Sequence, residues 1–286
     1  MNILICGHRA FAARGLADKL SHSGHEVLCF SRGEVMENDN VITGPVDKID
    51  CNPFLVNKKI DAIINFIVLK DRSLDENQAY IDSLVRMAKT HNVSKFIQIS
   101  SISSYPNDAK IIDENTAIET DGSLKGAYGS LKVGVDQSLI GAKCKLGLPV
   151  VFVRPGFIVA EDHPNPIGGI ALKLPMEFGI IMGNKQSTLP VIRREVFHDR
   201  LTEIVDDKTP LDTYILLDKR VSTKEMYVKS VVPTMKLISL PKGLVIMTAK
   251  LLKTMGVFDQ KKVCMVTGLF KQQVFNTKLS EEKTSR

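Results

Sequence analysis

The sequence predicts an α/β fold built around a doubly wound parallel sheet. In the first half of the chain, short apolar segments rich in Val, Ile and Phe alternate with segments of helical period that are a dozen or more residues long. The apolar segments are continuously hydrophobic, as in strands covered on both faces, and the intervening helices are long enough to connect parallel strands. Right-handed crossovers then place a ligand crevice beyond the carboxyl ends of the strands.

The expected elements follow one another in a regular order. Strands are expected at NILIC (2–6), EVLCF (26–30), DAIINFIV (61–68), KFIQIS (95–100) and PVVFVRPG (149–156). Apolar residues recur at helical spacing from the turn after the first strand to about Ser21, and again over 73–92, 126–147 and 194–207. These segments predict the helices that separate and follow the strands.

The alternation breaks down after residue 156. A turn-rich loop (160–169) and short extended pieces (179–192) follow, and the polar end SEEKTSR (280–286) is expected to fray. The apolar stretch 237–258 carries three lysines. It fits a helix packed on the core or a basic amphipathic helix on a membrane surface, and we favour the packed helix.

The composition of the 286 residues is that of a globular protein, with 44% hydrophobic and 24% charged residues. The sequence contains no apolar run of about 18 residues, so a transmembrane helix is not expected. The N-terminus lacks the pattern of a secretory signal. The five cysteines are scattered without a C-x-x-C pair, which argues against a metal site and favours a reduced, cytoplasmic setting. The net charge of +6 is dispersed, which disfavours nucleic-acid binding.

The turn after the first expected strand carries the first functional signal. Gly7 follows NILIC directly, and a residue without a Cβ there lets backbone N–H groups approach a pyrophosphate. Dinucleotide cradles usually have three glycines, and Ala10 and Ala13 stand at the other two positions. Taken alone, the turn fits a nucleotide cradle and an ordinary strand-to-helix turn equally well.

The end of the second expected strand indicates which dinucleotide would bind. NAD-preferring folds place an acidic residue there, against the ribose 2′-hydroxyl, whereas a guanidinium binds a 2′-phosphate. The chain has Ser31 and Arg32 at this position, and Arg9 in the turn is a second candidate guanidinium. We therefore expect NADP(H) as the preferred cofactor and NAD(H) as the alternative. The competing interpretation of Arg32 is a solvated surface arginine.

The most specific signal lies in the middle of the chain. KFIQIS runs into a serine cluster that begins at Ser101, and Tyr128 and Lys132 follow four residues apart in the next expected helix. At that spacing the two side chains share one helix face, where a nearby cation lowers the pKa of a tyrosine. Such a tyrosine exchanges a proton with a carbonyl or carbinol oxygen, which the Ser101 hydroxyl can also hydrogen-bond. A tyrosine and a lysine at this spacing are often only part of a solvated helix face. The serine cluster at Ser101 and the glycine turn at Gly7 favour a catalytic role for them here.

In this order, these features resemble the extended short-chain dehydrogenase/reductase family. They are the glycine turn, Ser31-Arg32, Ser101, Tyr128-x-x-x-Lys132 and VRPGFIV (153–159). The resemblance covers residues 1–165 well and the remainder loosely. It implies a Rossmann-type NAD(P)-binding domain at 1–160 and a smaller substrate-binding region, interleaved with the core, at 161–286.

The resemblance also implies roles for single residues. Tyr128 would be the acid/base, Lys132 would hold Tyr128 and the nicotinamide ribose, and Ser101 would orient the reacting oxygen. The cofactor-binding positions it implies beside Tyr128 and Lys132 are Gly7, Arg9, Ala10, Phe11, Ser31, Arg32, Phe66, Ile67, Asn77, Pro155 and Gly156. Candidates on the substrate side are Ser103, His163 as a second acid/base, and Arg193, Arg194 and Arg200 for a diphosphate. A solvated surface position is the alternative for His163 and the arginines.

Two details narrow the expected branch of the family. GHR (7–9) and SSISSYP (100–106) are similar to the GDP-fucose synthase branch, an NADPH-using epimerase–reductase, which supports NADP(H) and Arg9. Sugar 4,6-dehydratases carry an Asp-Glu pair directly after the catalytic hydroxyl residue, whereas this chain has Ile102 and Ser103. The dehydratase branch is therefore disfavoured.

The function expected from these residues is NADP(H)-dependent hydride transfer on a nucleotide-activated sugar, by a 4-ketoreductase or an epimerase. The alternatives are a reductase of a non-sugar carbonyl compound and a non-catalytic NADP(H)-binding sensor or assembly factor on the same fold. In many relatives the helices that here carry Asn77 and Tyr128 form a dimer bundle, so the resemblance also suggests a homodimer. The membrane contacts expected are at most peripheral.

Overall fold

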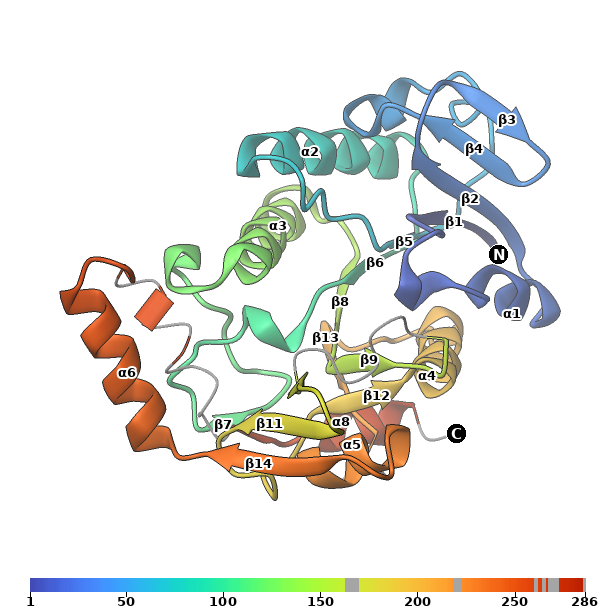
Figure 1. The fold of residues 1–286 in the computed structure, drawn as a ribbon. Coiled ribbons are helices and arrows are strands. Elements are labelled where there is room, and N and C mark those ends of the chain that lie inside the picture. Colours follow the sequence, from blue (N-terminus) through green and yellow to red (C-terminus); the bar gives the residue numbers. More distant parts are fainter. Residues whose placement is uncertain (163–169, 219–222, 260–261, 264–265, 267–272, 285–286) are drawn as a thin grey trace.

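A large, mostly parallel sheet forms the centre of the protein. The computed structural model describes residues 1–162, 170–218, 223–259, 262–263, 266 and 273–284. The sheet has eight strands in the order β13-β8-β6-β5-β1-β2-β4-β3 (Figure 1), all parallel to their neighbours except β3. Its strands are β1 (Asn2–Cys6), β2 (Glu26–Arg32), β3 (Met36–Asn38), β4 (Val41–Gly44), β5 (Ala62–Asn65), β6 (Lys95–Ile99), β8 (Val150–Pro155) and β13 (Thr213–Leu216).

Helices cover both faces of this sheet (Figure 1), which confirms the predicted doubly wound α/β fold. They are α1 (Leu16–His22), α2 (Leu74–Thr90), α3 (Ala127–Leu146) and α4 (Arg194–Asp206). Because side chains alternate along a strand, Leu4 and Cys6 of β1 pack in one core cluster with α2 and α3. Ile3 and Ile5 pack in the other cluster, with α1 and α4.

The expected strands form β1, β2, β5, β6 and β8, and β13 from the second half of the chain joins the sheet beside β8. The first helix differs from its prediction. Instead of beginning in the turn after Gly7, α1 begins at Leu16, because residues Phe11–Ala13 form a 3₁₀ turn and Gly15 has a left-handed φ of 81°. The donors near Gly7 are therefore those of an irregular turn and not those of a helix N-terminus.

The rest of the second half forms small sheets and helices beside the large sheet (Figure 1). β9 pairs with β12, β7 with β15, and β10, β11 and β14 form a three-stranded sheet. The bounds are β7 (Ile111–Ile112), β9 (Phe157–Val159), β10 (Ala171–Lys173), β11 (Phe178–Met182), β12 (Val191–Arg193), α5 (Lys224–Val231), β14 (Lys236–Leu240), α6 (Lys242–Thr254), β15 (Val274–Phe275) and α8 (Lys278–Lys283).

Two expectations for this half are wrong. The stretch 237–258 is not one helix packed on the core, because it divides into β14 and α6, and Ala249 is the buried residue of α6. The polar end does not fray over the residues described, because Ser280 and Thr284 are buried. A hydroxyl–carboxylate contact between Ser280 and Glu114 anchors α8. Over the described ranges, each helix is too short or too polar to span a bilayer.

Candidate active site

An open cavity of about 820 Å³ lies at the carboxyl ends of β1, β5, β6 and β8. Parallel strands bring their ends to one edge, so residues far apart in the sequence meet there. The sequence-predicted residues that line the cavity are Gly7, Ala10, Phe11, Phe66, Ile67, Ser101, Ser103, Tyr128, Lys132, Pro155 and Gly156. Gln273 and Phe275, which the sequence did not single out, add a wall from the C-terminal part of the chain.

Tyr128, Ser101 and Lys132 converge on this cavity. Tyr128 stands in the first turn of α3 and is 42% exposed. Ser101 ends β6, caps the following 3₁₀ turn by accepting a hydrogen bond from the Ser103 backbone N–H at 3.1 Å, and hydrogen-bonds the Tyr128 side chain. Lys132 is buried one turn further along α3, and its ammonium lies 5.8 Å from the Tyr128 ring centroid.

The pKa of Tyr128 is raised, whereas the sequence predicted that the nearby lysine would lower it. Burial raises the pKa of Tyr128 to about 12, and the hydrogen bond with Ser101 only partly offsets this effect. The Lys132 ammonium is not among the groups that shift the tyrosine pKa, and it donates a hydrogen bond to the Ile99 carbonyl oxygen at 2.6 Å. Burial lowers the pKa of Lys132 to about 8. At neutral pH the structure thus holds a protonated phenol beside an ammonium.

A buried ion pair under α3 completes the electrostatics of the site. Asp136, one turn after Lys132, accepts hydrogen bonds at one oxygen from the Ser100 hydroxyl at 2.6 Å and from the Arg154 guanidinium at 3.3 Å. Burial raises the pKa of the Asp136 carboxyl, whereas Arg154, Ser100 and Lys132 favour its charged form. The sequence analysis missed this network, although the spacing of Tyr128, Lys132 and Asp136 at successive turns of one helix could have revealed it.

The turn at Gly7 has the geometry of a close backbone approach. Gly7 has a φ of +86°, and a Cβ on it would lie 2.9 Å from Cγ1 of Ile67. Ile67 is held in place because its N–H donates at 3.0 Å to the Asn65 side chain, which in turn accepts a hydrogen bond from the Tyr80 hydroxyl. The turn therefore requires glycine for steric reasons and leaves backbone surface open to the cavity.

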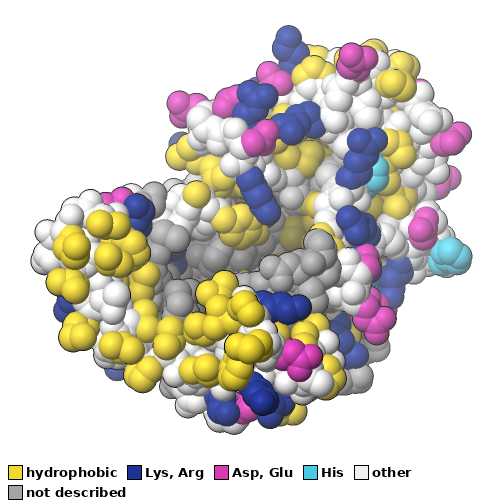
Figure 2. All heavy atoms as spheres, viewed as in Figure 1, with side chains coloured by type: hydrophobic (Ala, Val, Ile, Leu, Met, Phe, Trp, Pro, Cys, Tyr) yellow, Lys and Arg dark blue, Asp and Glu magenta, His cyan; other side chains and the backbone are white. Residues whose placement is uncertain are grey.

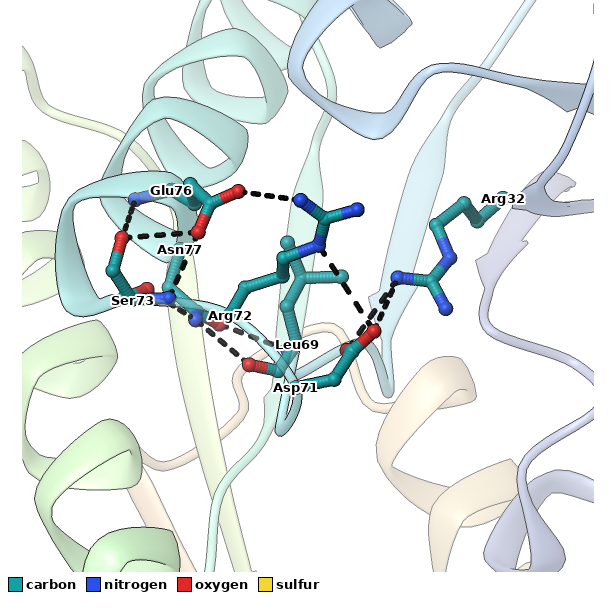
Figure 3. Close-up of polar contacts among 7 residues, drawn as sticks. All are labelled: Arg32, Leu69, Asp71, Arg72, Ser73, Glu76 and Asn77. Atoms are coloured by element: carbon teal, nitrogen blue, oxygen red, sulfur yellow. Dashed lines mark hydrogen bonds and ion pairs between the residues drawn. The ribbon is translucent and has the colours of Figure 1, made fainter.

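The residues predicted to bind the adenosine ribose lie at the end of β2, outside the lining of the cavity. Ser31 is buried, and among the residues described its hydroxyl has no hydrogen-bond partner. The Arg32 guanidinium is exposed but already forms an ion pair with Asp71 at 3.0 Å (Figure 3). Arg9 is also exposed. An orphaned buried hydroxyl and, on the next residue, an exposed guanidinium are groups that suit a phosphate ligand.

Asn77 positions the loop that carries Asp71 and does not line the cavity. Its amide donates to the Leu69 carbonyl oxygen at 3.0 Å and accepts from the Leu69 N–H at 2.9 Å, so both groups of one loop residue are fixed (Figure 3). Ser73 caps α2 in a capping box with Glu76. Asp71 is thereby held in reach of Arg32, whose hydrogen bond keeps the pKa of this carboxyl below its usual value.

The cationic candidates for a substrate diphosphate are paired with carboxylates outside the cavity. Arg193 pairs with Asp218 at 2.5 Å, and Arg200 pairs with Glu203 at 3.2 Å. Arg194 pairs with Asp162 at 2.9 Å and stacks over Phe11, with its guanidinium 5.1 Å from the ring centroid. Through Phe11, Arg194 is next to the cavity wall, and the other two are not. His163 lies outside the described residues.

Comparisons with known proteins identify similar sequences and folds. The model of the NAD dependent epimerase/dehydratase family matches residues 3–171. No curated protein matches the chain. Among solved structures, L-threonine dehydrogenase from Phytophthora infestans has a TM-score of 0.70 at 12% identity, covering 99% of this chain and 93% of that one.

Two further structures have nucleotide ligands. UDP-glucuronic acid 4-epimerase from Bacillus cereus, in complex with NAD, has a TM-score of 0.68 at 11% identity, covering 100% of this chain and 92% of that one. A human epimerase family protein with NADPH has a TM-score of 0.64 at 15% identity, covering 99% of this chain and 93% of that one. At these identities the likeness shows the fold alone.

Proposed function

Because this chain belongs to the NAD-dependent epimerase/dehydratase family, we propose that it is an NADP(H)-dependent 4-ketoreductase or epimerase of a nucleotide-activated sugar. The family membership bears out the resemblance seen in the sequence. It also makes the chain an NAD(P)-dependent enzyme of the short-chain dehydrogenase type. The observation that carries the proposal is the convergence of Ser101, Tyr128 and Lys132 on one cavity at the carboxyl edge of the sheet.

The cofactor fits the residues present at this edge. Gly7 and Lys132 line the cavity, where the turn at Gly7 would receive a pyrophosphate and Lys132 would bind a ribose hydroxyl, and Ser31 and Arg32 suit a 2′-phosphate. When bound, the nicotinamide supplies or accepts the hydride. A structure of the human relative contains NADPH and one of the Bacillus relative contains NAD, so the preference rests on the residues of this chain.

The proton chemistry follows from the protonated Tyr128. In the reducing direction the phenol O–H bond breaks, an O–H bond forms on the sugar oxygen, and the carbonyl carbon gains the hydride. The hydrogen bond with Ser101, which lowers the pKa of Tyr128, favours the resulting phenolate, and the Lys132 ammonium lies 5.8 Å from its ring centroid. In the proposed step the Ser101 hydroxyl also hydrogen-bonds the sugar oxygen. An epimerase runs this step in both directions, with the hydride returned to the opposite face of the sugar carbon.

The lining of the cavity disfavours elimination of water. Sugar dehydration requires a carboxylate pair as acid and base, and none of the described residues that line the cavity is Asp or Glu. Ser103 stands in the lining instead, with a buried hydroxyl that has no partner among the described residues. This hydroxyl is available to a sugar hydroxyl, as is expected for a reductase or an epimerase.

Replacing Tyr128 by Phe tests this assignment. We expect Y128F to lose at least about 100-fold in kcat while its Kd for NADPH stays unchanged, because general acid–base catalysis contributes about that factor or more. The assay screens UDP-, GDP- and dTDP-sugars and their 4-keto forms, with NADPH absorbance and product stereochemistry as readouts. The matched control is Y227F, because Tyr227 is a buried tyrosine that does not line the cavity.

The outcomes separate the alternatives. Full activity of Y128F would refute the assigned role of the tyrosine. Turnover of simple ketones but of no nucleotide sugar would identify a reductase of non-sugar carbonyl compounds. L-threonine dehydrogenase, whose fold is similar, is likewise not named for a sugar substrate. Tight NADPH binding without turnover of any carbonyl substrate would identify a sensor.

A further inference from the structure

One stripe of α6 presents large apolar side chains to solvent. Leu244, Met247, Leu251 and Met255 recur at the spacing of one helix face and are between 51% and 68% exposed. The opposite side contains Ala249, which is buried. Figure 2 shows hydrophobic side chains gathered over this helix. A contiguous apolar surface of this kind marks an interaction site.

The apolar surface continues onto the three-stranded sheet next to α6. Ile238 on β14, Leu172 on β10 and Met176 in the turn before β11 are 46%, 60% and 83% exposed. β10 and β14 both pair with β11 in one sheet, and β14 leads directly into α6. Figure 2 shows the hydrophobic side chains extending from α6 along these strands. Together with the α6 stripe, these residues form what we call the apolar face.

The charged residues of β14 and α6 are of one sign, whereas the exposed Glu177 follows Met176 in the turn before β11. Between residues 236 and 258 the chain has lysines and neither Asp nor Glu. The lysines, all exposed, are Lys236, Lys242, Lys250 and Lys253. Apolar side chains beside lysines complement the acyl boundary and the anionic headgroups of a bilayer, which attract both at once.

The length of α6 determines how it could meet a bilayer. Its 13 residues span about 20 Å, which is too short to cross a hydrocarbon core of about 30 Å. A helix of this length with one apolar stripe lies in the plane of the interface. A second copy of the chain is a less favourable partner for the apolar face than a bilayer. Pairing α6 with itself brings the lysines of both copies together, and no carboxylate in 236–258 neutralises them.

We propose that the apolar face docks this enzyme on the surface of an anionic lipid bilayer, with α6 lying in the interface plane. The docking is independent of the reaction, because none of the residues of the apolar face lines the catalytic cavity. Docking through the apolar face places the enzyme next to the membrane and leaves the large sheet and the catalytic cavity in solution.

Flotation of the full chain with lipid vesicles tests the proposal. We expect co-flotation with vesicles of phosphatidylcholine and phosphatidylglycerol in equal parts, weakening at high salt, and little with phosphatidylcholine alone. M247S/L251S should lower the partition coefficient roughly tenfold, because two apolar side chains no longer enter the interface. K242Q/K250Q should weaken binding to the anionic vesicles selectively.

Matched variants elsewhere on the surface control for nonspecific effects. V35S/M36S removes two apolar side chains that are as exposed as those of α6 but lie at the far edge of the large sheet, and K89Q/K145Q removes two exposed lysines from α2 and α3. Both should float like the wild type. Unchanged flotation of M247S/L251S would overturn the proposal, as would a wild-type dimer that this variant converts to a monomer without any vesicle binding. Unchanged NADPH binding shows that each variant is folded.

Discussion

Lys132 is a buried cation, and burying its charge lowers the free energy of unfolding. Burial lowers its pKa from the ordinary 10.5 to about 8, although Asp136 opposes the shift. Between pH 8 and pH 10.5 the unfolded chain therefore holds a proton on this lysine that the folded chain has lost. The contribution of Lys132 to the free energy of unfolding consequently rises as the pH rises through this window.

Replacing Lys132 by Met removes this pH dependence. We expect the free energy of unfolding of the wild type, relative to K132M, to increase by at most about 3 kcal/mol between about pH 7.5 and about pH 10.5. Urea unfolding at both pH values measures the increase. K145M, which removes an exposed lysine of the same helix, should show no such dependence. A difference between wild type and K132M that is constant with pH would contradict the assignment.

In the proposed cofactor site, Asp71 would compete with the 2′-phosphate of NADP(H) for Arg32. Their ion pair at 3.0 Å must be broken or shared before the guanidinium can bind a 2′-phosphate. Since both side chains are exposed, the pair is weak, and we expect D71N to bind NADPH roughly two- to fivefold more tightly and NADH unchanged. R32Q should lose the preference for NADPH. Fluorescence titration of each nucleotide measures both effects, with R86Q, another exposed ion-paired arginine, as the control. Equal affinity of the wild type for the two nucleotides would refute the role of Arg32.

At the level of the elements, buried strands were predictable and short exposed ones were not. β1, β5, β6 and β8 are covered on both faces, so their sequences are mostly apolar and recognisable. β3, with the sequence MEN, is fully exposed, and backbone pairing with β4 alone defines it. The late start of α1 depends on the left-handed Gly15, a conformation that glycine permits but does not require.

The candidate site was predictable where a helix period fixes the spacing. Tyr128 and Lys132 share one helix, and the strand-end position of Ser101 followed from its apolar neighbours. Contacts made by tertiary packing were not predictable. The pairing of Arg32 with Asp71 and the contribution of Phe275 to the cavity both join segments whose proximity depends on the complete fold.

The junction of β8 with β9 is a tight crossing of backbones beside the cavity. A Cβ on Gly156 would lie 2.3 Å from the Pro190 carbonyl oxygen, so the strand end cannot carry a side chain without moving the neighbouring segment. We expect G156A to lower the free energy of unfolding by about 2–3 kcal/mol. G141A is the matched control, because Gly141 lies in α3 where an added Cβ would meet open space, and this change should stabilise by up to about 1 kcal/mol. Chemical denaturation compares the two, and equal stabilities would argue against the crowding.

At the scale of the whole molecule, the C-terminal segment holds the two halves together. The Ser280 hydroxyl accepts a hydrogen bond from the Ile215 N–H at 2.9 Å and donates to Glu114 at 2.6 Å, which joins α8, β13 and the loop after β7. We expect S280A to lower the free energy of unfolding by about 1–3 kcal/mol, because the buried N–H loses its partner. S187A, which removes the hydroxyl of a half-buried turn residue that donates to the Asn184 carbonyl oxygen within the same turn, should cost less than S280A. A neutral S280A would show that water replaces the hydroxyl.

The wall formed by Gln273 and Phe275 also fixes the order in which the enzyme matures during synthesis. All strands of the large sheet except β13 precede residue 156 and leave the ribosome early, and domains fold in that order as the chain grows. The strand β15 pairs with β7, so the cavity wall that contains Gln273 and Phe275 forms only after these two residues have been made. A nascent chain can thus form most of the large sheet before the cavity at its edge is enclosed.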